Sequence, residues 1–192
     1  MVELTDNCYL SNILVCEIPM RGMIVGRFQP FHKGHLSVIK YILNEVDDLI
    51  VIIAASQQSH QPKNPFTAGE RYDMIHNSLV EELKDITRVI IIPANDVNDN
   101  GLWVAHITRL VPKFDIVYTN NPHTRYLFEH AGKEVRTPPM YDREDYSAQN
   151  VRDLMKKGKS EWKKLVPKAV EEVIDDIDGL TRIKVINSTD RE

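Results

Sequence analysis

The sequence predicts an α/β fold in which an open parallel sheet carries helices on both faces. From residue 21 onward, short β-rich runs alternate with segments of helical period, which is typical of strands joined by crossover helices. The runs 49–55 and 88–92 are apolar at nearly every position, as expected of strands buried on both faces. With 192 residues, of which 42% are apolar and 27% charged, the chain can bury the core of one such domain.

Apolar runs and helix signals give the order of the elements. The expected strands are 22–26, 49–55, 88–92, 115–119 and 134–136. An apolar stripe at helical spacing marks the helix between the first two strands: Leu36, Ile39, Leu43 and Val46.

Capping residues place the later helices. Thr67 and Glu70 form a capping box at the start of the second helix. Its expected buried face consists of Tyr72, Ile75 and Leu79. Four further helices are expected at 100 to about 112, 122 to about 131, 147 to 158, and 167–176.

Composition restricts the possible function classes. With 24 Lys and Arg against 28 Asp and Glu, the net charge of −4 argues against nucleic-acid binding by bulk charge. No apolar run reaches the length of about 18 residues that a membrane helix needs. Both cysteines, Cys8 and Cys16, precede residue 20, so we expect a core without disulfides and a reducing, cytoplasmic location. We divide the chain into an extension 1–19, a domain 20–184 and a polar tail 185–192.

The segment 26–35, GRFQPFHKGH, lies where the first expected strand ends and the first helix begins. Open parallel sheets bind ligands at this edge, and a helix N-terminus favours phosphate there. His32 and His35 are three residues apart, so both rings project to one side of a helical first turn. Gly34 allows a ligand close to the backbone, and Arg27 adds a positive charge. This group of residues suits the charge that develops on a polyphosphate.

Spacing alone leaves other interpretations of the two histidines open. A histidine at a helix start is commonly a cap or a surface residue. The pair is also compatible with half of a metal site, although no further His or Cys cluster with ligand spacing completes one. The sequence contains neither G-x-G-x-x-G nor a P-loop ending in Gly-Lys-Ser/Thr. We therefore expect phosphate binding by another device.

The string G-R-F-Q-P-x-H-x-G-H resembles the signature of the HxGH nucleotidyltransferases. The full string is similar to the archaeal type of nicotinamide mononucleotide (NMN) adenylyltransferase. The similarity continues from Met20 to about Lys184 in five further stretches: 64–71, 100–104, 121–122, 138–139, and 146–152. The resemblance implies a Rossmann-like nucleotidyltransferase fold with a small helical C-terminal part.

The resemblance also implies a reaction, in which the 5′-phosphate of NMN attacks the α-phosphorus of ATP to give NAD and pyrophosphate. No covalent intermediate is needed, so positioning and charge neutralisation carry the catalysis. Mg²⁺ would arrive with ATP, and no metal ligand from the protein is implied. The implied catalytic residues are His32, His35, Arg27 and Arg152. The implied ATP-binding residues are Gly26, Arg27, Phe28, Gln29, His32, Gly34, His35, Ser147, Gln149 and Arg152.

The second phosphate segment departs from the family pattern. The family has Ser-x-Thr-x-x-Arg at a late helix start; here Ser147 and Arg152 match, but Gln149 replaces the Thr. A Gln amide donates hydrogen bonds from a longer arm. From the residues alone, Ser147 is an ordinary N-cap and Arg152 a solvated side chain.

For NMN, the resemblance assigns Trp103 to stacking on the nicotinamide ring, with Asn100 and Asn121 as nucleotide contacts. Two alternatives remain: another acceptor (phosphopantetheine, a cytidylyl acceptor or flavin mononucleotide), or an idle nucleotide-binding protein. The expected partners are ATP, NMN and NAD, without nucleic acid or membrane. The resemblance further implies a homo-oligomer, commonly a hexamer.

Overall fold

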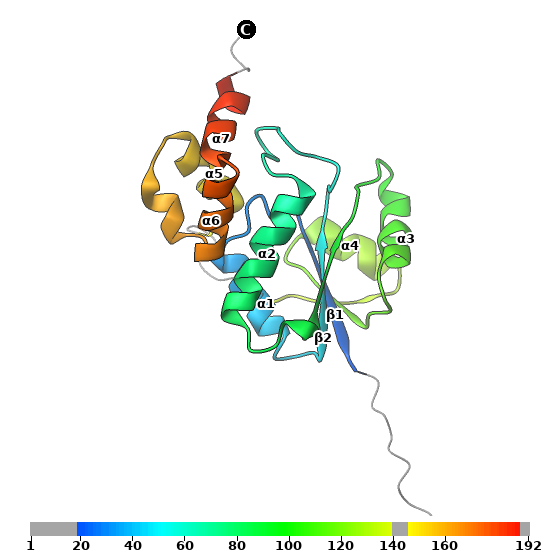
Figure 1. Cartoon of the computed structure of the whole chain (residues 1–192). Helices are drawn as coiled ribbons and strands as arrows, with labels where there is room; N and C mark the ends of the chain where they lie inside the picture. Colours follow the sequence, from blue (N-terminus) through cyan, green and yellow to red (C-terminus); the bar gives the residue numbers. More distant parts are fainter. Residues whose placement is uncertain (1–18, 140–145, 189–192) are drawn as a thin grey trace, which may run out of the picture.

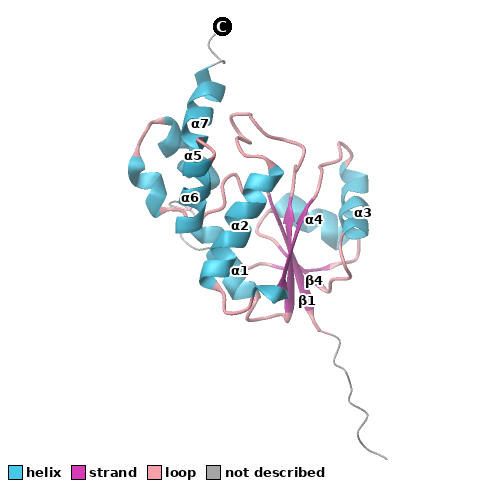
Figure 2. Cartoon of the chain, in the orientation of Figure 1, coloured by secondary structure: helices cyan, strands magenta, loops and turns pink. Residues whose placement is uncertain are grey.

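A computed structural model describes residues 19–139 and 146–188. Its centre is a five-stranded sheet in the order β3-β2-β1-β4-β5, with every neighbouring pair parallel (Figure 2). The strands are β1 (Arg21–Gly26), β2 (Asp48–Ile53), β3 (Val89–Pro93), β4 (Ile116–Tyr118) and β5 (Glu134–Arg136). The expected fold class is confirmed, and all five expected strands are present to within two residues at each end.

Helices cover both faces of the sheet (Figure 1). The helices are α1 (Lys33–Ile42), α2 (Ala68–Glu82), α3 (Asn100–Leu110), α4 (Pro122–His130), α5 (Ala148–Lys156), α6 (Lys168–Asp176) and α7 (Gly179–Ser188), with 3₁₀ turns η1 (Ile86–Arg88) and η2 (Ser160–Lys164). In Figure 1, α1 and α2 lie on one side of the sheet, and α3 and α4 on the other. Helices α5, α6 and α7 gather beside α1 and α2 and extend that layer.

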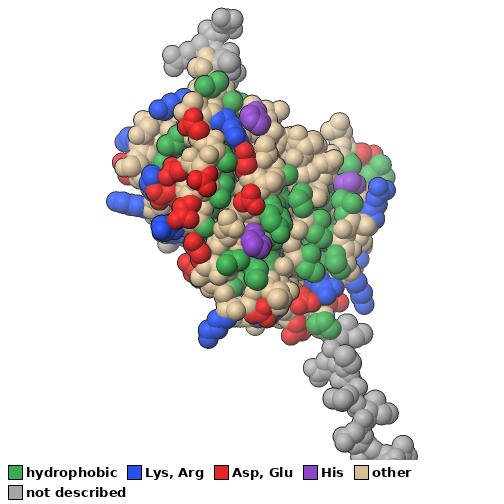
Figure 3. Space-filling view, viewed as in Figure 1, with side chains coloured by type: hydrophobic (Ala, Val, Ile, Leu, Met, Phe, Trp, Pro, Cys, Tyr) green, Lys and Arg blue, Asp and Glu red, His purple; other side chains and the backbone are tan. Residues whose placement is uncertain are grey.

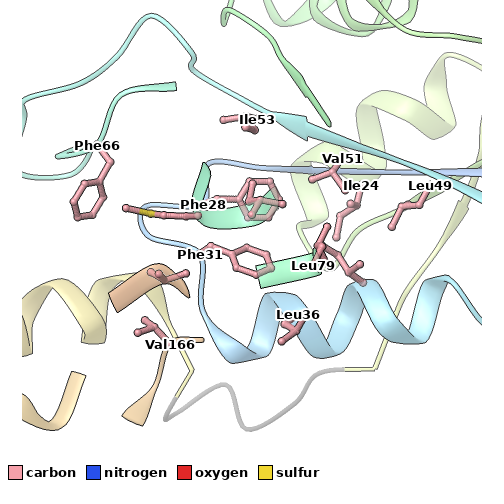
Figure 4. Close-up of a cluster of buried hydrophobic side chains, with 14 of the residues drawn as sticks. Ile24, Phe28, Phe31, Leu36, Leu49, Val51, Ile53, Phe66, Leu79 and Val166 are labelled. Atoms are coloured by element: carbon pink, nitrogen blue, oxygen red, sulfur yellow. The ribbon is translucent and has the colours of Figure 1, made fainter. Parts of the chain in front are cut away.

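The alternation of side chains along the strands produces two apolar cores. Ile24 in β1 and Val51 in β2 face the core formed with α1, α2 and the C-terminal helices (Figure 4). Met23 and Ile50 face the smaller core formed with α3 and α4. Because β2 is buried on both faces, its near-continuous apolar sequence is explained.

The strand order places a topological switch point beside β1. The chain proceeds from β1 to β2 on one side, and β4 and β5 lie on the other side. The loops that follow β1 and β4 therefore diverge and leave a crevice at the carboxyl ends of the strands. The segment 26–35 lies at this edge, where a ligand site is expected.

Two expectations about helices were wrong. Tyr72 does not lie on the buried face of α2; it is 37% exposed, whereas Arg71 beside it is fully buried. The long apolar portion of tyrosine suggested burial, but the face of α2 that meets the sheet edge carries the arginine. Helix α7 was not predicted, because the polar residues near the chain end conceal a short apolar face that buries Ile183.

No helix within residues 19–139 and 146–188 is long and apolar enough to span a membrane. The first 18 residues, including both cysteines, lie outside the described part of the chain. On the face shown in Figure 3, acidic side chains gather over the region of α6, a helix with the carboxylates Glu171, Glu172, Asp175 and Asp176. Part of the negative charge is therefore concentrated on one helix surface.

Candidate active site

The loop between β1 and α1 is anchored by buried side chains. The rings of Phe28 and Phe31 lie in the core beside α1 (Figure 4). The buried Gln29 side chain binds the main chain of Phe66 twice: its amide donates to the carbonyl at 2.9 Å, and its oxygen accepts the N–H at 3.0 Å. Gln29 therefore fixes this loop to the segment that precedes α2.

His32 and His35 cap the start of α1 reciprocally. Nδ1 of each ring accepts the main-chain N–H of the other residue, both at 3.3 Å. The rings stack with their centroids 3.5 Å apart and their planes at 22°. Because both Nδ1 atoms accept hydrogen bonds, the proton of each neutral ring resides on Nε2. The pair thus offers two Nε2–H donors.

Burial keeps both imidazoles neutral. It lowers the pKa of His32 to about 4. Burial, followed by repulsion from His32, lowers the pKa of His35 well below its usual range. A phosphate next to the rings would favour their charged forms and raise both pKa values.

Two glycines leave room for the rings of this loop. A Cβ on Gly34 would lie 2.9 Å from Cβ of Tyr146 and 3.1 Å from Nδ1 of His32. A Cβ on Gly26 would lie 2.7 Å from the ring of Phe28. Both positions therefore require glycine because a side chain there would collide with neighbouring atoms. Neither residue has a positive φ, so the backbone conformation is not the reason.

A first cleft of about 440 Å³ lies between this loop and the C-terminal helices. Four of its lining residues are cationic: Arg27, Lys63, Arg152 and Lys156. His35 contributes to the same wall, and Asp153 is its one carboxylate among the described residues. The excess of positive charge matches a polyphosphate ligand.

Helix α5 positions the second phosphate segment against the first. Ser147 is its N-cap and accepts the N–H of Asn150 at 3.1 Å. Arg152 donates from Nη1 to the carbonyl of Gln29 at 2.7 Å, which joins α5 to the β1–α1 loop. Burial, with repulsion from Arg27, lowers the pKa of Arg152. Gln149 is exposed and lines the first cleft, in the place of the expected hydroxyl.

A second cleft of about 600 Å³ opens at the carboxyl ends of β1, β2 and β4. Its lining includes Asn100, Trp103 and Asn121, the three residues assigned to NMN, together with Asp96. Trp103 is held edge-on against Phe128, with ring centroids 5.5 Å apart at 72°. The side-chain oxygen of Asn121 caps α4 by accepting the N–H of Thr124 at 3.0 Å, and its amide group still carries N–H donors.

Arg27 lines both clefts, which therefore meet at the end of β1. The fold thus brings together predicted residues from four separate parts of the sequence: 26–35, 100–103, 121 and 147–152. They differ in access: His35 lines the first cleft, whereas His32 lies behind it and is 5% exposed. Phe28 and Gln29 also line the first cleft, although their side chains are mostly committed to packing and loop attachment.

Sequence reasoning missed some cleft residues. Lys63 lies in the connection before α2. Its only signal in the sequence is its position next to the 64–71 stretch. Lys156 follows Arg152 by four residues and so shares its helix face, a spacing that could have identified it. Ile183 and Asn187 line the cleft from α7, the helix that was not predicted. Among the described residues, no cluster of three or more His, Cys, Asp or Glu could hold a metal ion.

Comparisons with known proteins identify the family of this chain. A cytidylyltransferase-like family model matches residues 23–154. The nicotinamide-nucleotide adenylyltransferase of Thermoplasma acidophilum is 48% identical over 172 residues, or 90% of this chain and 94% of that protein. The corresponding protein of Ignicoccus hospitalis is 45% identical over 171 residues, or 89% of this chain and all of that protein. The chain belongs to the nicotinamide-nucleotide adenylyltransferase family.

Solved structures share the fold of this family member. A bifunctional NMN adenylyltransferase/ADP ribose pyrophosphatase from Francisella tularensis superposes with a TM-score of 0.75 at 22% identity, covering 90% of this chain. The chain spans about half of that protein, 54% of its length. A further structure, from Vibrio parahaemolyticus, gives a TM-score of 0.60 at 16% identity. These structures show the fold, and the identities to the Thermoplasma and Ignicoccus proteins confirm the family resemblance seen in the motifs.

Proposed function

We propose that this protein transfers the adenylyl group of ATP to the 5′-phosphate of NMN, producing NAD and pyrophosphate. The observation that carries the proposal is the place of Arg27, which lines both a cationic cleft and the cleft that contains Trp103. A reaction between two phosphorylated ligands needs their phosphates to meet, and a guanidinium at the junction can bind both. The family relationship supports the same pair of substrates.

ATP occupies the first cleft in this proposal. Lys63, Arg152 and Lys156 surround the triphosphate, and His35 donates its Nε2–H to a phosphate oxygen. His32, behind the cleft wall, holds the ring of His35 by stacking and by the reciprocal cap, and so fixes the direction of the His35 donor. Gln149 lines this cleft and offers its amide to the phosphates. Gly26 and Gly34 leave room for the rings of the loop, and Ser147 caps the helix that carries Arg152.

NMN occupies the second cleft. The positively charged nicotinamide ring stacks on the indole of Trp103, whose face attracts cations. Asn100, at the first turn of α3, and Asn121, at the N-cap of α4, supply hydrogen bonds to the nucleotide. Its 5′-phosphate then points toward the junction at Arg27.

Catalysis rests on placement and charge in this site. The 5′-phosphate oxygen of NMN forms a bond to the α-phosphorus of ATP as the bond to the pyrophosphate oxygen breaks. Since a phosphate monoester is already a nucleophile, no side chain needs to remove a proton. Arg27 and the histidine pair stabilise the charge on the α-phosphate, while the cations of the first cleft hold the leaving pyrophosphate.

Mg²⁺ is the expected cofactor, and it would enter as the ATP complex. The first cleft fits this arrangement, because its lining combines several cations with the single carboxylate of Asp153 among the described residues. The phosphates themselves are therefore the main oxygen ligands for the metal. When bound, the ion neutralises charge on the triphosphate. A Francisella tularensis relative by fold was solved with AMP and a manganese ion.

The decisive experiment measures NAD and pyrophosphate after the full chain is incubated with ATP, Mg²⁺ and NMN. Parallel reactions contain phosphopantetheine, flavin mononucleotide or nicotinic acid mononucleotide as the acceptor, and CTP as the donor. We expect NAD to form fastest from NMN and ATP. Adenylylation of another acceptor without NAD formation would refute the acceptor assignment, and no transfer to any acceptor would favour an idle nucleotide-binding protein. We also propose a homo-oligomer, with the hexamer as the leading case, which sedimentation velocity can measure.

A further inference from the structure

Arg71 is a buried arginine at the sheet edge that carries the clefts. Its side chain is fully buried, with 0% exposed. Nε donates to the carbonyl of Thr67 at 3.1 Å, and Nη1 donates to the carbonyls of Arg27 at 2.9 Å and Ala54 at 2.8 Å. Nη2 donates to the carbonyl of Ala55 at 3.1 Å. One guanidinium thus joins the ends of β1 and β2 to the N-cap of α2.

The charge of Arg71 has no ion-pair partner within the described residues. Its four hydrogen bonds all go to main-chain carbonyls, and no salt bridge in residues 19–139 or 146–188 includes it. Burial, together with repulsion from Arg27, lowers the pKa of Arg71 to about 10, so the group stays protonated at neutral pH. Burying an unpaired charge is costly. An apolar side chain would fill the space at lower cost, unless the planar guanidinium with its several N–H donors is needed.

The acceptor carbonyls show which parts of the backbone the planar guanidinium of Arg71 holds in place. The carbonyl of Arg27 belongs to the residue whose side chain lines both clefts, and Ala54 lines the second cleft. Ala55 has a φ of +50°, a conformation that side-chain-bearing residues rarely adopt. Three donors in one plane fix these carbonyls relative to each other, which a single ammonium group cannot do.

We infer that Arg71 is a positioning residue, which sets the backbone of Arg27 so that its guanidinium reaches both substrates at the junction of the clefts. This inference rests on the proposed adenylyl transfer. Arg71 itself contacts no cleft in the described structure, since neither cleft lining includes it. Its effect on the reaction is therefore transmitted through the main chain of Arg27.

The chain offers a matched control in Arg88. This half-buried arginine also binds three carbonyls, donating to Asp47 at 2.6 Å, Leu43 at 2.9 Å and Val46 at 2.6 Å. Those carbonyls lie at the C-terminal end of α1 and before β2, at the opposite edge of the sheet. Arg88→Lys removes the same kind of fork without touching the clefts.

The first test compares Arg71→Lys with Arg88→Lys in steady-state NAD formation. We expect R71K to lower kcat by about 10- to 100-fold, as misplaced catalytic groups do, with KM for ATP and NMN changed by less than about threefold. R88K should retain the wild-type kcat. A kcat for R71K equal to that of R88K would overturn the inference, while NAD formation by the wild type keeps the proposed function.

The second test is a double-mutant cycle with Arg27→Ala. If Arg71 acts through Arg27, R71K should lower kcat by less than about twofold once the Arg27 side chain is absent. A loss in the R27A background as large as in the wild type would show that Arg71 acts independently of Arg27. That result would assign it a general role in the fold and refute the inference.

Hydrogen–deuterium exchange gives a readout that does not depend on NAD formation. In R71K we expect faster exchange in peptides covering 26–31 and 54–56, with unchanged exchange in β3 and α4. Faster exchange throughout the sheet would indicate general destabilisation and contradict the inference. Arg71→Gln, which keeps two N–H donors without the charge, is the second variant. If neither variant folds while R88K does, Arg71 maintains the fold and the inference is wrong.

Discussion

Gly34→Ala tests whether the space beside the histidine pair is essential for the reaction. The added Cβ would lie 2.9 Å from Cβ of Tyr146, 3.1 Å from Nδ1 of His32 and 3.2 Å from its Cε1. Carbon atoms pack best at about 3.5–4.0 Å, so these neighbours must retreat by about 0.5 Å. The hydrogen bond from the N–H of His35 to Nδ1 of His32 is already 3.3 Å long and would break.

The chain provides a matched control for this change. Gly69 is the second residue of α2, as Gly34 is of α1, and a Cβ added to Gly69 would have no atom within 4 Å. Both substitutions gain up to about 1 kcal/mol of helix propensity. In Gly34→Ala, overpacking costs about 1–3 kcal/mol and exceeds that gain. We therefore expect Gly69→Ala to be neutral or stabilising, and Gly34→Ala to be destabilising by up to about 2 kcal/mol.

Activity should separate the two variants more sharply than stability. A shift of the catalytic rings of under 1 Å can cost about 10²-fold, so kcat of Gly34→Ala should fall by about 10- to 100-fold. Gly69→Ala should keep its activity. Urea denaturation and NAD formation measure the two quantities. If Gly34→Ala forms NAD as fast as Gly69→Ala, the stacked arrangement of His32 and His35 is unnecessary for the reaction.

Four further predictions concern single side chains. Trp103→Ala should raise KM for NMN about tenfold without changing KM for ATP, because it removes the stacking surface; a rise in both would contradict separate clefts. Lys156→Ala should raise KM for ATP about threefold, and less so in high salt, whereas Lys157→Ala, outside the cleft lining, should not. His32 binds its proton with a pKa of about 4 when folded and about 6.5 when unfolded, so its contribution to stability is complete above pH 6.5 and declines as pH falls to 4. Urea titrations should show a weaker pH dependence in this window for His32→Asn, which keeps the N-cap acceptor. Arg182→Met removes a pair of bonds to Glu70 (2.7 and 2.9 Å) and should lower the free energy of unfolding by about 2 kcal/mol, measured by denaturation.

The sheet and its crossover helices were predictable because local pattern and tertiary role agree. The apolar run of β2 indicates a strand buried on both faces, and it is buried on both faces. The capping box of Thr67 and Glu70 predicted the start of α2 to the residue. The prediction that Tyr72 is buried was wrong. Helical periodicity gives the spacing of the residues on a buried face, but it does not decide which way that face is turned when a polar residue, here Arg71, occupies part of it.

The arrangement of the candidate site was predictable where its residues are adjacent in sequence, and less so where the fold assembles them. The spacing of His32 and His35 predicted rings on one side, and they stack. It did not predict that each ring would cap the other residue's N–H, since this depends on the extended backbone of His32. Lys63 and Asn187 line the first cleft but belong to segments that are far apart in the sequence. Neither residue is part of a recognisable motif, so the sequence alone does not indicate that they lie close together in space.

The electrostatics of the site follow from how its cations are attached. Arg27 repels both Arg71 and Arg152, and this repulsion contributes to the lowered pKa of each. The fold tolerates this because Arg71 and Arg152 bind main-chain carbonyls of the same loop, at Arg27 and Gln29. Carbonyl oxygens satisfy the guanidinium donors without cancelling their charge, as carboxylates would. The positive potential therefore remains available to phosphate, and the neutral histidine pair can add charge when the phosphate arrives. A chain with a net charge of −4 thus concentrates positive charge in the cleft proposed for ATP.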